Sequence, residues 1–478
     1  MVILLGGIAL AQRGGLSNPE GQAATASGLM AGAGSPSSDL NGGKNPLLGG
    51  IPQGEPTGSI LPLSLSEALS RGLKHNLGAR LSQESVSATR GARLLALSQL
   101  LPKVTAGVTE MQEQVNLAAF GFQGFPGMKT VVGPLNVFDV RAYVNQTILD
   151  FSALNRYHAA AENLTAAEYS QDNTRDMVVF ICANLYLQAV AGSSRIESAR
   201  AQVRTAEALR DLALDQKAAG VVAGIEVLRA QVELQAQQQR LIVAEDQFAK
   251  DKLALARAIG LPLGQEFSLT DGISYAPVPG MSLEDSVQRA YKERPDYQGA
   301  QARVRAAESD RKAAQAGRLP TINFSADYGD IGQRPWQSHG SFTVTTSVRV
   351  PIFQGGSVRG RVLEAEASLH QREAELEDLR GQIYYDVRRA FLDLKTAADL
   401  VQVAQSAVQL ADEQVRQSQD RFGAGVTNNV EVVQAQEAMA TASENYISSL
   451  HAHSAAKLAL AKAMGVSDTE YEQFLRGK

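Results

Sequence analysis

Residues 281–292 read MSLEDSVQRAYK, and they repeat residues 63–74, which read LSLSEALSRGLK. The match continues without a gap over 40 positions, of which 11 are identical, at an offset of 218 residues. A second match, at an offset of 205, pairs KLALARAIG at 252–260 with KLALAKAMG at 457–465. The chain therefore contains two copies of one unit. The two offsets differ by 13, so the first copy carries about 13 extra residues in its middle.

Both copies are predicted to have the same order of elements: a helical stretch, a pair of strands and two long helices. Strands are predicted where apolar and polar residues alternate, because successive side chains of a strand point to opposite faces. The first copy spans 61–262, with helices over 65–100, strands over 103–151 and helices over 152–259. The second copy spans 281–467, with helices over 283–318, strands over 321–350 and helices over 357–464.

The long helix after the second strand pair carries a regular apolar row. Between Leu376 and Val415 apolar residues follow one another at steps of three or four, close to 3.5 on average. That period predicts a coiled-coil seam with a left-handed supercoil. Glycine-rich turns at 219–224 and 423–429 are predicted to reverse the chain between the paired long helices.

The remaining segments are short or rich in small polar residues. Residues 1–11 form an apolar run that ends in Ala-Leu-Ala, which is typical of a secretory signal. The Gly-, Ser- and Pro-rich stretch 12–60 is predicted to be a flexible leader. Residues 263–280 are predicted to be a linker between the copies, and 468–478 a C-terminal tail.

Composition excludes several function classes. The net charge is −5 without a polybasic run, so nucleic acid is not an expected partner. The chain has one cysteine, Cys182, which excludes a disulfide framework or a CxxC metal site. No catalytic, cofactor-binding or metal-binding constellation is evident, so an enzyme is not expected. Beyond the N-terminus there is no uninterrupted run of 18 apolar residues, so membrane-spanning helices are not expected either.

The strand pairs imply an assembly. Membrane β-barrels start at eight strands, so the four strands of one chain cannot close a barrel. Two chains would supply eight strands, whose interior is filled by side chains. Three chains would supply twelve and leave a lumen lined by the polar strand faces. The predicted fold class is mainly α with membrane β, as a homotrimer whose twelve-stranded β-barrel continues into a long α-helical barrel.

The duplication, the strands between helices and the turn sequences resemble the TolC-like family of outer-membrane efflux proteins. The turns read AGVVAGIEVLRAQ at 219–231 and GAGVTNNVEVVQAQ at 423–436, and the resemblance covers about residues 60–470. It implies a trimeric tunnel in the outer membrane with a helical extension in the periplasm. It also implies a passive exit duct for a tripartite efflux pump or a type I secretion system. The implied partners are a periplasmic adaptor, an inner-membrane transporter and outer-membrane lipid.

The resemblance also suggests site residues in the tip turns and just inside them. Residues that would meet the adaptor are Gly220, Val221, Gly224, Gly423, Gly425 and Val426. A simple chain reversal is the alternative for these turns. Residues that would lie at the periplasmic aperture are Glu431, Gln434 and Phe422, with Gln434 where a second acid is often found in the family. A solvated carboxylate at a helix start is the alternative for Glu431.

Aromatic residues in or beside the strands are interpreted as membrane-interface residues, because rings gather at the borders of a bilayer. They are Phe120, Phe122, Phe125, Phe138, Trp336 and Phe342. Local loop packing is the alternative for each ring. For the whole chain, the alternative function is a periplasmic or cytoplasmic coiled-coil scaffold without channel activity.

Overall fold

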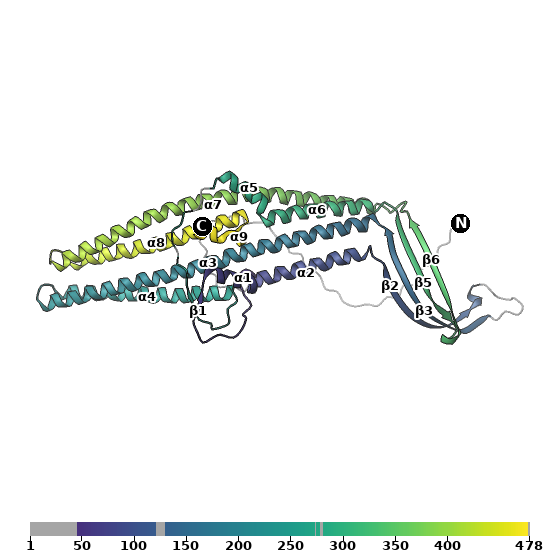
Figure 1. Cartoon of the computed structure of the whole chain (residues 1–478), viewed down its shortest axis with the longest axis horizontal. Coiled ribbons are helices and arrows are strands. Elements are labelled where there is room, and N and C mark those ends of the chain that lie inside the picture. The colour runs from purple at the N-terminus through teal and green to yellow at the C-terminus, as the bar shows by residue number, and fades with distance from the viewer. Residues whose placement is uncertain (1–44, 121–129, 273, 278–280, 477–478) are drawn as a thin grey trace, which may run out of the picture. The chain divides into compact units, whose positions relative to one another are not determined.

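The computed structural model describes residues 45–120, 130–272, 274–277 and 281–476, all within one compact unit (Figure 1). Its helices are α1 (Leu65–His75), α2 (Leu77–Ser98), α3 (Phe151–Ala218), α4 (Gly224–Ala258), α5 (Leu283–Glu293), α6 (Pro295–Ala316), α7 (Ser357–Gly423), α8 (Asn429–Met464) and α9 (Ser467–Arg476). Its strands are β1 (Leu61–Leu63), β2 (Lys103–Asn116), β3 (Val131–Leu149), β4 (Phe267–Leu269), β5 (Thr321–Gly332) and β6 (Ser338–Arg349). Short 3-10 helices lie at Pro46–Leu48, Leu117–Phe120 and Pro335–Gln337. The fold is therefore mainly helical, with two repeats of the same element order.

The long helices form two hairpins. The α3–α4 hairpin and the α7–α8 hairpin each turn back at the end far from the β-sheet (Figure 1). Ile383, Val387, Ala390 and Val401 of the predicted α7 seam are buried, which confirms the helical period read from the sequence. The two hairpins are thus held internally by apolar rows spaced for helix-to-helix packing.

In each repeat two short helices follow one another directly, α1 and α2 in the first and α5 and α6 in the second, and specific residues mark the break between them. Asn76 ends α1 and begins α2, and its side-chain oxygen accepts a hydrogen bond from the backbone N–H of Gly78 at 2.9 Å. In the second repeat Pro295 is the first residue of α6, where its missing N–H costs no helical hydrogen bond. Each break lets a short helix turn across the long ones while the next helix runs along them.

Four of the described strands form an antiparallel sheet in the order β2-β3-β5-β6. The strands β2 and β3 contain 14 and 19 residues, whereas β5 and β6 contain 12 each. The extra residues of the first repeat therefore lengthen its strand pair, while α3 and α7 keep nearly equal lengths of 68 and 67 residues.

Two apolar clusters lie where the short helices cross the long ones. One gathers Val178, Cys182 and Tyr186 of α3 around Leu255 of α4 and α1 residues. The other gathers Ile383 and Val387 of α7 around Met464 of α8. These clusters fix the middle of the molecule, and the hairpins extend from them toward the tips.

Three of the predicted segments need correction. The flexible leader expected over 12–60 is wrong for 45–60, because Ile51 donates a backbone hydrogen bond to the His75 carbonyl at 2.8 Å. The expected linker 263–280 contains β4, which pairs in parallel with β1. The expected tail contains α9, whose Phe474 is buried against the second cluster. Each segment is ordered by partners far away in sequence, which local composition does not reveal. Residues 1–44, which include the predicted signal, lie outside the described residues.

Among the described residues, one helix is apolar enough to cross a membrane by length and composition. An 18-residue window of α3 has a mean hydropathy of 1.5, and 56% of that window is buried inside the protein. Such burial is typical of a helix in the core of a protein. The helix contacts α4 of its own hairpin, α8 of the other hairpin and the short helices α1, α2 and α6, which explains its apolar character.

Candidate functional site

The two hairpin tips have the same backbone geometry. The N–H of Val221 bonds to the Gln216 carbonyl at 2.9 Å, and the N–H of Val426 bonds to the Arg421 carbonyl at 3.0 Å. Six-residue closures of this kind end a helix through a glycine in the left-handed conformation. Gly220 has φ of +77° and Gly425 has φ of +72° at the corresponding places. The repeats therefore build two equivalent tips.

The other two tip glycines have a different role. Gly423 is the last residue of α7 and Gly224 the first of α4, and neither has a positive φ. Among the four predicted tip glycines, only Gly220 and Gly425 therefore adopt a backbone angle that favours glycine. A Cβ added at Gly423 would meet no atom within 4 Å, so the position tolerates alanine sterically.

Each tip presents an apolar side chain to the outside. Val221 is 62% exposed and Val426 is 70% exposed, and they occupy the same position in the two turns. An apolar side chain at the apex of a polar hairpin is available for contact with another molecule. In each tip the exposed valine directly follows the glycine that has a positive φ.

The two hairpins touch one another just inside the tips. The amide of Asn429 donates to the carbonyl of Glu226 at 3.3 Å, linking α8 to α4. Phe422 packs with Leu209 and Val432 and is only 1% exposed. The prediction that Phe422 lines an aperture is therefore wrong, because its ring lies inside the contact between hairpins.

Glu431 lies in the first turn of α8 and is paired. Its carboxylate lies 3.3 Å from the guanidinium of Arg421, and the hydroxyl of Thr427 donates to it. Its side chain is 36% exposed, and Gln434, three residues further along α8, is exposed. Both lie on an accessible part of the hairpin, and Arg421 offsets part of the charge that sequence reasoning assigned to Glu431.

Glu226 occupies the equivalent place after the first tip but is more enclosed. It pairs with Arg229 at 2.7 Å, and its side chain is 13% exposed. Its second carboxylate oxygen is buried without a hydrogen-bond partner among the described residues. Glu226 and Glu431 occupy equivalent positions after the two tips, but their surroundings in the structure differ.

The aromatic residues near the sheet are partly described. Trp336 and Phe342 are strongly exposed at the turn between β5 and β6 and on β6, and Phe138 of β3 is half-buried. Phe122 and Phe125 lie outside the described residues, as does the side chain of Phe120. The membrane-interface interpretation of these rings stays a prediction.

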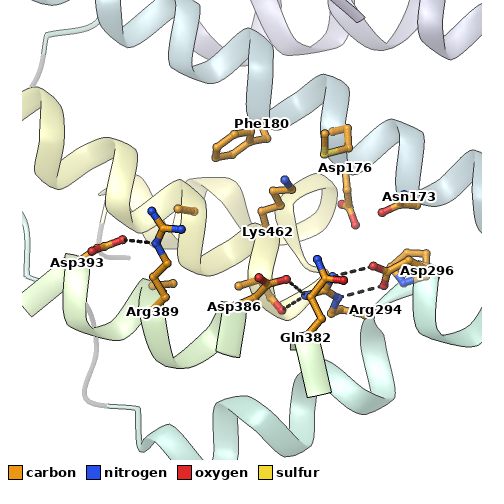
Figure 2. A pocket seen from close by; sticks show the side chains of 16 residues that line it. Asn173, Asp176, Phe180, Arg294, Asp296, Gln382, Asp386, Arg389, Asp393 and Lys462 are labelled. Carbon is orange, nitrogen blue, oxygen red and sulfur yellow. Dashed lines mark hydrogen bonds and ion pairs between the residues drawn. The ribbon is translucent and has the colours of Figure 1, made fainter. Parts of the chain in front are cut away.

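Sequence reasoning missed a charged pocket where the two repeats meet. A cavity of about 480 Å³ lies between α3, the start of α6, α7 and the end of α8 (Figure 2). Arg294 bonds both carboxylate oxygens of Asp296, at 3.0 and 2.7 Å, and reaches Asp386 at 3.2 Å. Little in the sequence indicated this pocket, since the residues that line it are scattered over four helices.

Asp176 is the buried acid of this pocket. It is 6% exposed, and it accepts a hydrogen bond from the backbone N–H of Asp468 at 2.9 Å, at the start of α9. Burial raises the pKa of Asp176 to about 6. Arg175 also pairs with Asp468 at 2.8 Å, so the first residues of α9 are held by two neighbouring side chains of α3.

Metal binding finds no support in the described part of the chain. No group of three His, Cys, Asp or Glu side chains there is arranged to hold a metal ion. His453 is buried beside Tyr275, with ring centres 4.9 Å apart, and burial lowers its pKa to about 4. A neutral buried histidine packed on a tyrosine is a structural element of the core.

The duplicated architecture matches a known family. The family described as outer membrane efflux protein matches residues 73–261 and 286–466, one stretch in each repeat. The chain belongs to this family. Membership makes it an outer membrane efflux protein and confirms the resemblance noted in the sequence.

Curated relatives and solved structures agree with the family. The pyoverdine export outer membrane protein OpmQ of Pseudomonas putida is 25% identical over 317 residues, covering 64% of this chain and 66% of OpmQ, just under two thirds. The probable efflux pump outer membrane protein TtgC of the same species is 22% identical over 416 residues, covering 84% and 83%. The structure of the Campylobacter jejuni CmeC outer membrane channel matches with a TM-score of 0.74 and 16% identity, over 88% of this chain and 92% of that one. This efflux-family member thus shares the fold of outer membrane channels along most of its length.

Proposed function

We propose that the protein is a trimeric, passive exit duct in the outer membrane, serving a tripartite efflux pump or a type I secretion system. In this proposal three copies pool their strands into one twelve-stranded barrel. Their helical hairpins form a tunnel through the periplasm. The duct does no chemistry, and a separate inner-membrane transporter supplies the energy.

The observation that carries the proposal is a sheet with one apolar face and two open edges. On that face Val104, Val144, Ala326 and Val344 are aligned across β2, β3, β5 and β6. Val104 and Val344 are well exposed, on strands that have no outer neighbour among the described residues. An open edge beside an exposed apolar face would aggregate in water, and lipid tolerates only closed barrels.

The opposite face of the sheet is polar, as a water-filled lumen requires. Arg141 of β3 pairs with Asp139 and with Asp327 of β5, and also donates to the hydroxyl of Ser341 at 3.1 Å. Three sheets of four strands give twelve, an even number within the range of outer-membrane barrels. Polar side chains that bond to one another inside the lumen would leave the apolar face for lipid.

The hairpins carry apolar stripes that one copy leaves uncovered. On α4 the stripe consists of Ile225, Leu228, Val232, Ile242 and Leu253, each at least half exposed. On α7 it consists of Leu392, Val403 and Leu410, each at least 61% exposed. The spacing of both stripes suits a coiled-coil partner, and α4 and α7 lie in different hairpins. A ring of copies would bring the α4 of one copy against the α7 of the next.

The tips are the proposed contact for the adaptor. Val221 and Val426 project from glycine-rich turns at the end far from the sheet, and their hairpins reach deepest into the periplasm in this arrangement. Docking there would place the duct in line with an inner-membrane transporter. The aperture would lie just inside the tips, near Glu431 and Gln434.

Native mass in mild detergent and conductance in a planar bilayer test the proposal together. We expect a mass of three chains, about 153 kDa at 50.9 kDa each, and channels of stable conductance. A protein that is monomeric, or soluble without detergent, would contradict the duct and favour the scaffold alternative.

A further inference from the structure

An exposed apolar turn joins the sheet to the long helix of the second repeat. The strand β6 leads into α7 at the end of the sheet that faces the helices (Figure 1). Between them Ile352 is 96% exposed and Phe353 is 89% exposed, the highest values among the large apolar residues of the described chain. Adjoining apolar side chains that are this exposed mark a surface that another molecule covers.

The turn forms one wall of a cavity of about 430 Å³. The other walls are the end of α6 with the residues after it and the first turns of α7, from which Arg318 and Arg359 line the cavity. The lining contains no Asp or Glu. Both arginines are exposed, and neither makes an ion pair within the described residues. The cavity, which we call the junction cavity, therefore combines an apolar wall with two uncompensated positive charges.

The heptad spacing of α7 shows on which side of this helix the junction cavity lies. Buried residues of α7 are separated by multiples of seven, at Leu369, Ile383, Ala390, Ala397, Ala404 and Ala411. Arg359 precedes Arg380 by three heptads, and the guanidinium of Arg380 lies 5.8 Å from the ring centre of Tyr291 on α5. Leu363, which also lines the cavity, precedes Phe391 by four heptads, and Phe391 packs against the cluster that contains α5. The junction cavity is therefore on the side of α7 against which α5 packs.

In the proposed ring of copies this side of α7 faces away from the tunnel. The crossing helices α1 and α5 would fill the tunnel if they lay inside it, so they lie outside. The apolar face of β6 leads to the same place, because Val344, Val348 and Val350 alternate along the chain and are each about 60% exposed. The junction cavity therefore borders the apolar outer surface of the sheet, at its periplasmic end.

The distance along the strand places the junction cavity at a border of the bilayer. Phe342 of β6, which is 74% exposed, precedes Ile352 by ten residues. At roughly 3.3 Å per residue and a strand tilt of about 40°, ten residues rise about 25 Å along the membrane normal, the height of the apolar band of outer-membrane barrels. If Phe342 marks one border of the band, Ile352 and the two arginines lie at the other, where acyl chains give way to headgroup phosphates.

We propose that the junction cavity binds an anionic phospholipid of the periplasmic leaflet, with its phosphate between Arg318 and Arg359 and its acyl chains against Ile352 and Phe353. This site rests on the proposed duct, because the duct places the sheet in a membrane. Guanidinium groups bind phosphate oxygens through paired hydrogen bonds, and aromatic rings gather at the borders of a bilayer. A zwitterionic lipid brings a cation of its own close to the two arginines, so an anionic lipid is preferred.

The contact with lipid is tested by tryptophan fluorescence of the full-length protein in vesicles. The chain has one tryptophan, so Trp336→Phe with Phe353→Trp moves it to the junction cavity. With phosphatidylglycerol brominated on its acyl chains, we expect the fluorescence to fall by about half or more, because the ring lies at the depth of the upper acyl chains. The matched control is Trp336→Phe with Tyr385→Trp, an exposed ring roughly 42 Å further along α7, which should not be quenched.

Vesicle flotation separates a failure of the site from a failure of the duct. Protein that floats with the vesicles but is not quenched at position 353 would have this ring covered by a neighbouring copy or in water, which overturns the site and leaves the duct. Protein that does not float would contradict the duct and the site together.

The role of charge is tested by removing both arginines in the variant that carries the tryptophan at position 353. Titrating brominated phosphatidylglycerol into unlabelled phosphatidylcholine gives the preference of the site for the anionic lipid. Arg318→Gln with Arg359→Gln should lower this preference about tenfold or more, because each basic residue at an anionic surface contributes about fivefold. The matched control is Arg90→Gln with Arg303→Gln, which removes the same charge from exposed residues more than ten positions before the following strand, and it should stay within about twofold. No preference in the original protein, or an equal loss in both double variants, would overturn the phosphate site.

Discussion

The helices α3 and α7 are the same element of the two repeats, yet the protein buries them differently. They have nearly equal lengths of 68 and 67 residues, but 21 residues of α3 are buried against 10 of α7. The difference comes from position, because α3 lies between the other helices whereas α7 keeps an exposed side. The two copies of this helix keep the same length and helical period, but the elements packed around each one determine which of its faces are buried.

The largest expected effect comes from charging the exposed side of α7. Val403→Asp combined with Leu410→Asp should abolish the trimer, because a ring of copies would bury both carboxylates at a cost of several kcal/mol each. The measurement is native mass in detergent. If the trimer persists, the stripe on α7 is not an interface, and its contrast with α3 needs another cause.

The matched control keeps the helix and the spacing. Gln402→Asp combined with Gln409→Asp adds the same charge seven residues apart on the neighbouring exposed face of α7. We expect the trimer mass to be unchanged. Equal loss in both variants would point to a general effect of charge on α7.

A second comparison between the repeats concerns the glycines of the two tips. Gly425→Val should strongly reduce export while the trimer assembles, because a β-branched residue at φ of +72° is strained by roughly 1–2 kcal/mol or more and distorts the turn. Export and crosslinking to the adaptor measure the effect. Unchanged export and crosslinking would leave the turn as a chain reversal only.

Gly423→Ala provides the control at the same tip. The position is helical and has free space around it, so alanine should be neutral or stabilise by up to about 1 kcal/mol. Gly220→Val extends the comparison to the first tip, where φ is +77°. An effect at Gly425 that is absent at Gly220 would assign docking mainly to the second hairpin.

The sequence predicted elements whose signals are local and periodic. The row through Ile383, Val387 and Ala390 indicated a helix face, and those residues are buried. The alternation of apolar and polar residues predicted strands over 321–350, and β5 and β6 lie there. Backbone period alone decides such features, so one sequence suffices to predict them.

Features that depend on partners distant in sequence escaped prediction. The parallel pair of β1 and β4 joins residues about 200 positions apart, and neither strand is long enough to show a period. The same holds for Asp176, which meets Asp468 only after the chain has folded. The family resemblance suggested that Phe422 lies at the aperture, whereas the packing of Leu209 from the other hairpin buries it.

A third test concerns Asp176, a buried acid of α3; the buried residues of α7 include no acid. The pKa of Asp176 in the folded protein is raised by burial from 3.8 to about 6. Its stabilising effect on the folded state is therefore fully present below pH of about 4 and lost as the pH rises through about 6. Docking of α9 should be tighter at pH 5 than at pH 7.5, measured by hydrogen exchange corrected for intrinsic rates.

The variant Asp176→Asn should lose most of this pH dependence of stability, while its side chain still accepts the hydrogen bond from the Asp468 N–H. At pH 7.5 it should stabilise the protein by at most about 3 kcal/mol, the value that corresponds to a pKa of about 6 against 3.8. Some pH dependence of stability should remain in this variant, because burial also raises the pKa of Asp172 on the same helix. Asp393→Asn, an exposed acid at the rim of the pocket, is the control and should change little.

The smallest effect is expected at the acids of the two tips, and it depends on their different pairing. Glu431 is more accessible than Glu226, and three copies around a common axis would repel one another and attract cations. Glu431→Gln should lower the cation preference of the channel modestly, because Arg421 at 3.3 Å already offsets part of the charge. Glu226→Gln should change it less, since that carboxylate is bound to Arg229 and largely enclosed.

Removing the partner distinguishes a paired acid from an unimportant one. Arg421→Gln leaves Glu431 uncompensated, so cation preference should rise above that of the original protein, opposite in sign to Glu431→Gln. Reversal potentials under a salt gradient measure all three variants in one bilayer experiment. Equal shifts from Glu431→Gln and Glu226→Gln would remove the distinction between the two hairpins. No shift from Glu431→Gln or Arg421→Gln would leave Glu431 as a carboxylate that stabilises the start of α8, and the selective constriction would have to lie at other residues.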